Sequence, residues 1–92
     1  MRQQITVSTW GQRLNGGQYH LDDEITVRPH VDETWDEATK RSLERRTGYQ
    51  MVTWRADSST AASIIYQGTL CDPCPGGGWT PRGEVWASIP RS

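Results

Sequence analysis

The fold is decided by TWDEATKRSLERRTG, residues 34–48, which has helical character and lies between segments of alternating β pattern. Thr34 and Glu37 have the spacing of a capping box, in which the two side chains satisfy N–H groups at a helix start. Gly48 is a natural helix end because glycine adopts the left-handed conformation without steric cost. We therefore expect a helix that begins at Asp32 or Thr34, runs to about Arg46 and stops at Gly48.

This segment has a narrow apolar side. Trp35, Ala38 and Leu43, with Ser42 at the margin, recur at helical spacing. Acidic residues lie early and basic residues late, which suits the helix dipole. The pattern indicates a surface helix that is laid on a sheet by one tryptophan and one leucine.

Two strands are expected before the helix. Residues 5–10 alternate between apolar and polar side chains, which is the pattern of a half-buried strand. Asn15-Gly16 is a strong hairpin signal, because both residues tolerate a positive φ. The second strand is expected from Gln18 or Tyr19 to about Arg28, with a bend, bulge or exposed edge at the acidic run 22–24.

Three strands are expected after the helix. They cover residues 49–55, 62–70 and 84–89, with a loop at 56–60 and an irregular proline- and glycine-rich segment at 71–83. The order β-β-α-β-β-β with short connections predicts an α+β fold. We expect a single domain over residues 1–92, built as an antiparallel sheet of four to five strands with one helix on a face.

Composition excludes several classes of protein. The 92 residues carry a net charge of −1, which argues against a general nucleic-acid binder. No apolar run approaches the roughly 18 residues of a membrane-spanning helix, and no apolar signal-peptide core follows the N-terminus. We therefore expect a cytoplasmic protein. Lys40 is the only lysine against nine arginines, Asn15 is the only asparagine and phenylalanine is absent, which indicates a GC-rich bacterial genome.

Cys71-x-x-Cys74 allows four interpretations. Two thiolates at this spacing form half of a zinc site, with His20 and His30 as candidates for the remaining ligands, or with one metal shared between two copies. A redox pair is disfavoured because no helix can start at the glycines that follow. A disulfide is disfavoured in a reducing cytoplasm. Two ordinary thiols in a loop are the interpretation that we favour.

Trp79 is the tryptophan that we expect to be exposed, since it follows Gly76-Gly77-Gly78 whereas the other four are expected to be structural. The glycines match neither a phosphate-binding loop nor a dinucleotide fingerprint. Tryptophan is enriched at binding hot spots, so Trp79, with Gly77 and Arg82 beside it, is the candidate partner anchor.

Arg41, Arg45 and Arg46 form a basic cluster near the helix end. Such a cluster can bind a protein partner or, with nearby aromatic residues, RNA. The alternative that we favour over RNA binding is a solvated helix face that complements the dipole.

The sequence contains residue types that catalysis uses, but no known catalytic motif. His20, His30, Glu24 and Arg28 are the residue types that a small ribonuclease needs, and they lie close in sequence. No hydrolase, metalloprotease or kinase motif is present. We therefore expect no enzyme.

The leading hypothesis is a non-catalytic protein-binding module without a cofactor. It would be a monomer or homodimer that occupies a surface of a larger protein or complex, as a small phage or mobile-element inhibitor does. A nucleic-acid-associated or zinc-stabilised module is the alternative, and a small ribonuclease-like enzyme is the third hypothesis.

Overall fold

A computed structural model describes residues 3–91, which form five strands and one helix. Along the chain they are β1 (Ile5–Arg13), β2 (Glu24–Val27), α1 (Trp35–Thr47), β3 (Gln50–Ser59), β4 (Ser63–Pro73) and β5 (Trp79–Pro90). All five strands belong to one antiparallel sheet in the order β2-β1-β5-β4-β3, so β5 is the central strand. The predicted α+β class and element order are confirmed. Among the described residues, no helix is long and apolar enough to cross a membrane.

The helix has the two ends that the sequence predicts. The Glu37 backbone N–H donates to Thr34 Oγ1 over 3.4 Å, and the Thr34 N–H donates to Glu37 Oε1 over 3.1 Å. Gly48 has a φ of 80°, and its N–H donates to the Glu44 carbonyl over 2.9 Å. Local side-chain chemistry thus sets both boundaries.

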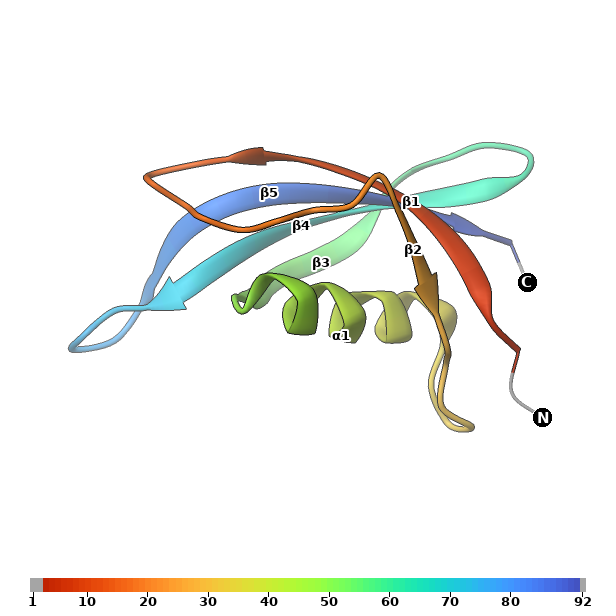
Figure 1. Ribbon diagram of the computed structural model, residues 1–92, viewed down its shortest axis with the longest axis horizontal. Coiled ribbons are helices and arrows are strands. Elements are labelled where there is room, and N and C mark those ends of the chain that lie inside the picture. The colour runs from red at the N-terminus through yellow and green to blue at the C-terminus, as the bar shows by residue number, and fades with distance from the viewer. Residues whose placement is uncertain (1–2, 92) are drawn as a thin grey trace.

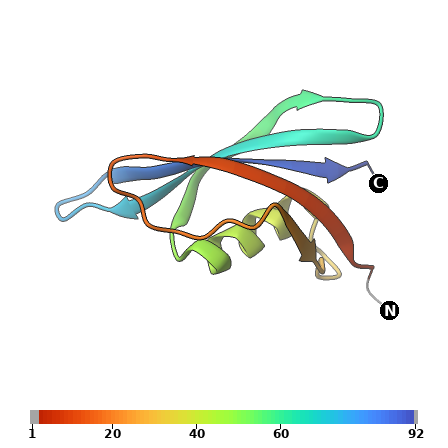
Figure 2. The ribbon, with the colours of Figure 1, turned by 45° about the horizontal axis from the view of Figure 1, so that its top comes forward.

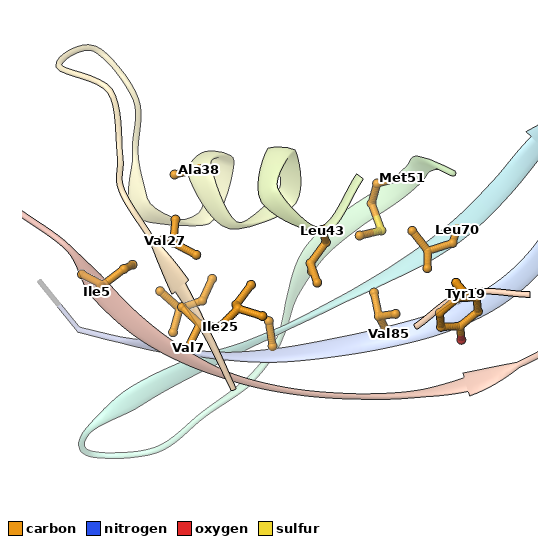
Figure 3. Packing of buried hydrophobic residues seen from close by; sticks show 12 residues of the cluster. Ile5, Val7, Tyr19, Ile25, Val27, Ala38, Leu43, Met51, Leu70 and Val85 are labelled. Carbon is orange, nitrogen blue, oxygen red and sulfur yellow. The ribbon is translucent and has the colours of Figure 1, made fainter. Parts of the chain in front are cut away.

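The sheet arches over α1, which lies on its inner side, and no helix or strand of residues 3–91 lies on its outer side (Figures 1 and 2). Leu43 points from α1 toward the sheet, where it belongs to the same core cluster as Leu70 of β4 and Val85 of β5 (Figure 3). All three are fully buried. Trp35 packs at the margin of this cluster, as predicted, while the fully buried Thr39 was not expected.

The second strand is shorter than predicted. Asn15 and Gly16 do form a turn, with φ values of 46° and 74°, but the residues that follow do not pair with β1 as a strand. Tyr19 turns its ring into the core instead of continuing a strand, and is only 8% exposed. Regular pairing of this segment with β1 is confined to Glu24–Val27 and begins at the last residue of the acidic run.

The prediction of a loop at residues 56–60 is wrong, because β3 continues through Ser59. Two register shifts, at Val52 and Asp57, leave one extra residue each in β3. Bulges of this kind accommodate polar residues in an edge strand. The actual turn is tighter and is held by Thr60 Oγ1, which accepts from the Ser63 N–H over 3.0 Å.

Residues 71–83 were predicted to be irregular, yet most of them form a hairpin. β4 extends to Pro73, β5 begins at Trp79, and the Cys74 N–H donates to the Gly78 carbonyl over 3.0 Å. Pro73 and Pro81 are tolerated because they lie beyond the ends of the neighbouring strands β3 and β1, where no ladder needs their missing N–H.

Candidate binding surface

The two sides of the sheet differ because side chains alternate along each strand. Thr9 and Ala87 point toward α1 and are buried, whereas their neighbours Trp10 and Trp86 point away from it. We call the side away from α1 the uncovered face. By strand register it carries Ser8, Trp10, Gln12, Glu24, Arg55, Ile65, Gln67, Thr69, Trp79, Glu84, Trp86 and Ser88.

Three of the five tryptophans lie on the uncovered face. Trp10 in β1 is directly opposite Trp86 in β5. Trp79, the first residue of β5, is opposite Pro73, and the register shift at Arg82 places it on the same side as Thr69 of β4. Trp10 and Trp79 are each 44% exposed. The expectation that Trp10 is structural was wrong, because the odd-numbered residues of β1 take the core positions. Trp54 does pack inside, where it stacks on Tyr66 with the ring centroids 5.4 Å apart.

Gly77 and Arg82 lie in the same hairpin as Trp79 but have different roles there. Gly77 is at the tip, with a φ of 108° that only glycine adopts readily. The Arg82 guanidinium donates to Asp72 Oδ2 over 3.0 Å and to the Asn15 carbonyl. It therefore ties the hairpin to the turn after β1, and is not a free contact group beside Trp79.

The three helix arginines do not form a free cationic surface. Arg41 makes two hydrogen bonds to the Glu33 carboxylate, both 2.9 Å long, which hold the pKa of Glu33 at about 2. Arg46 pairs with Asp22 over 2.9 Å. Within residues 3–91, Arg45 alone of the three is exposed and without an ion pair.

The two cysteines are not brought together. Three residues of extended chain span about 10 Å, more than the roughly 7 Å between Cα atoms that a disulfide allows. The thiols also point to opposite sides of the hairpin. Cys74 Sγ lies 2.7 Å from Thr80 Oγ1, while Cys71 is buried outside the core cluster, and burial raises the pKa of the Cys71 thiol.

The histidines do not join the cysteines or each other. His20 is exposed and its Nε2 lies 2.8 Å from Asp22 Oδ1, whereas the backbone N–H of His30 donates to Glu33 in the loop before α1. The part of the chain that the structure describes contains no group of three or more His, Cys, Asp or Glu residues placed to hold a metal ion.

One apolar hollow of about 380 Å³ lies between the start of α1, the start of β4 and the end of β5. Trp35, Tyr66 and Ile89 are among its lining residues, and Asp36 and Arg91 supply its charges. Arg91 Nε donates to the Thr60 carbonyl over 2.9 Å, so this cation also holds the turn between β3 and β4.

The charges of the uncovered face are sparse, and sequence reasoning missed how they are arranged. Glu24 and Glu84 flank the Trp10–Trp86 pair, and Arg55 lies in β3, at the far edge. Within residues 3–91, neither carboxylate makes an ion pair or a hydrogen bond. The alternation of β1 signalled that Trp10 and the apolar residues occupy opposite faces, but no local signal pairs β1 with β5.

No protein-family model matches this chain, and no curated protein or solved structure is significantly similar to it. The function is therefore inferred from the chemistry of the uncovered face.

Proposed function

We propose that the chain is a non-catalytic protein-binding module whose uncovered face occupies a surface of a larger protein. One observation carries the proposal: three of the five tryptophans lie on the face that α1 leaves open, and two of them are 44% exposed. Tryptophan buries a large rigid area at low entropic cost and dominates many binding hot spots.

The charges of this face support a protein partner over a nucleic acid. Of the strand residues assigned to this face within residues 3–91, Arg55 is the only cation, against Glu24 and Glu84. Binding to nucleic acid depends on several cations that neutralise phosphates. Arg41 and Arg46, which could have supplied them from the helix, are already paired with carboxylates.

The form of β3 supports contact through the face and not through the β3 edge of the sheet. Bulges at Val52 and Asp57 interrupt the ladder, and Glu44 Oε2 accepts from the Met51 N–H over 2.9 Å. These features hinder the addition of a further strand. A phage or mobile-element inhibitor built in this way would act by covering a functional surface of a host protein.

The test is capture of a partner from extracts of the source cells by the immobilised chain, compared among single variants. We expect a discrete partner to be retained by the wild type and lost with Trp10→Ala or Trp79→Ala. Val31→Ala is the matched control, because Val31 is 79% exposed but lies in the loop before α1. Urea unfolding checks that each variant keeps its fold.

Two results would contradict the proposal. One is a partner that both tryptophan variants retain as well as the wild type does. The other is an unfolded Trp79→Ala variant, which would make Trp79 part of the core and not a contact residue.

A further inference from the structure

We propose that the uncovered face receives an arginine-rich segment of its partner, with a guanidinium group over the Trp10–Trp86 pair and the carboxylates of Glu24 and Glu84 as counter-charges. This inference rests on the proposed function and names the chemistry of the partner. It is carried by the position of two unpaired acids beside the tryptophan pair.

The strand register fixes these positions. Trp10 is directly opposite Trp86, Ser8 is opposite Glu24, and Gln12 is opposite Glu84. Glu24 and Glu84 are therefore both diagonal neighbours of Trp10, at the roughly 7–8 Å that long side chains bridge. Both carboxylates are on the same face as the two indoles.

The chemistry of this arrangement favours a cation. The face of an indole ring attracts a cation within about 6 Å of its centroid. A carboxylate on either side adds Coulomb attraction and accepts hydrogen bonds. Arginine suits such a site better than lysine, because its planar guanidinium stacks on an aromatic ring while its N–H groups reach a carboxylate.

Three acids elsewhere in the molecule already have a cationic partner. Asp22, Glu33 and Asp72 are each paired with an arginine of the same chain. For Glu24 and Glu84, the described residues supply no such partner, so a cation from outside meets no competitor.

Arg55 makes the charge of the uncovered face uneven, with the carboxylates near Trp10 and a cation at the β3 edge. It lies in the same row as Trp10, Trp86 and Gln67, two strands away from β5, which is about 10 Å. In a bound basic segment, the arginine side chains should therefore lie over β1 and β5. The residue nearest β3 should be neutral or acidic.

The experiment is an NMR titration of the ¹⁵N-labelled chain with a capped hexa-arginine peptide at low ionic strength. Each of the five tryptophans gives one indole N–H signal, so the spectrum reports on every candidate ring separately. We expect the signals of Trp10 and Trp86 to shift together and saturate, while those of the inner Trp35 and Trp54 stay in place. Hexa-glutamate should cause no shift.

Charge variants make the test specific. Glu84→Gln and Glu24→Gln should each weaken binding of the peptide about two- to five-fold, as expected for one exposed ion pair. Arg55→Gln should strengthen it, because a like charge is removed. Asp32→Asn is the matched control, since Asp32 is an exposed acid in the loop before α1 and its loss should leave the affinity unchanged.

The inference is overturned if no indole signal shifts at millimolar peptide, if the shifts fall elsewhere, or if Asp32→Asn weakens binding as much as Glu84→Gln. Its failure is distinguishable from failure of the proposed function. A protein captured through Trp79 without any peptide binding would refute only this inference. Peptide binding without any captured protein would refute only the proposed function.

Discussion

The two faces of the sheet are made by the same strands, yet their side chains differ in exposure to solvent. On the inner face, Val7, Leu70 and Val85 are fully buried beneath α1. On the uncovered face, Trp10 sits one residue from the buried Thr9 and keeps 44% of its surface in solvent. A chain of 92 residues has little apolar area to spare for its core. Large rings left outside that core are the observation on which the proposed binding role rests.

The polar groups divide in the same way. Around the helix, two acids are paired with arginines of the same chain, in Glu33–Arg41 and Asp22–Arg46. On the uncovered face Glu24 and Glu84 have no such partner among the residues described. Burial and pairing thus supply stability on the inner side of the sheet, while the uncovered face retains groups that can still gain contacts. Substitutions on each face test this division.

The largest expected effect is on the inner face. Leu43→Ala removes a fully buried side chain and leaves a cavity between α1 and the sheet, which should lower the free energy of unfolding by about 3 kcal/mol. Trp10→Ala, on the uncovered face, should lower it by less than about 1 kcal/mol despite removing a larger ring, because that ring is half in solvent. Urea unfolding of both variants measures the difference. Equal losses would show that the two faces do not divide stability and recognition.

Close packing against the inner side of β4 gives the next largest effect. A methyl group at Gly68 would lie only 2.6 Å from the Thr53 carbonyl oxygen and 2.8 Å from Trp54 Cε3. Gly68→Ala should therefore cost about 2 kcal/mol through overpacking, since backbone cannot move aside cheaply. Thr69→Ala, at the next residue and on the uncovered face, should cost less than half as much. The same unfolding measurement decides it, and a neutral Gly68→Ala would refute the packing described for Trp54.

Local chemistry made much of this fold predictable. The helix ends follow from Thr34, Glu37 and Gly48, whose caps involve residues only three or four positions apart. Strand boundaries were less predictable because they depend on distant partners. Pro73 and Pro81 look like breakers in sequence, but they sit where the neighbouring strands have already ended, which only the register reveals.

The candidate surface was predictable only in part. The exposure of Trp79 follows from its place beside glycines. The pairing of Trp10 with Trp86 joins residues at opposite ends of the chain, and no local pattern indicates it. Likewise, Arg41 and Arg46 look like a basic patch in sequence, because their partners Glu33 and Asp22 lie outside the helix.

The Glu33–Arg41 pair provides a smaller effect that depends on pH. Hydrogen bonds from Arg41 lower the pKa of Glu33 from 4.5 to about 2, so the pair contributes fully above pH 4.5 and its contribution is lost as the pH falls toward 2. Both side chains keep some contact with solvent, so we expect the contribution to be about 1 kcal/mol. Glu33→Gln should lose this amount at neutral pH and unfold with a weaker pH dependence between pH 4.5 and 2.

A matched control uses an unpaired acid. Glu24→Gln removes a carboxylate on the uncovered face that no residue of the described chain pairs with, so its free energy of unfolding at neutral pH should equal that of the wild type. Thermal unfolding at several pH values checks both variants. A wild-type profile for Glu33→Gln would mean that this ion pair adds nothing to stability.

The smallest expected effect is at Tyr19, where a polar group is buried on the inner face without a hydrogen bond. The ring is 8% exposed and packs edge-on against Tyr49 with the centroids 6.0 Å apart, but its hydroxyl is buried without a hydrogen-bond partner in the described chain. An unpaired buried hydroxyl is costly, so Tyr19→Phe should leave the free energy of unfolding unchanged or raise it by up to about 1 kcal/mol. Tyr49→Phe is the contrast, because the Tyr49 hydroxyl accepts from the Gln18 N–H over 3.0 Å and its loss should cost about 1 kcal/mol. If Tyr19→Phe were instead the more destabilising of the two, the Tyr19 hydroxyl would have to be satisfied in solution, and the inner face would contain a polar contact that packing alone does not explain.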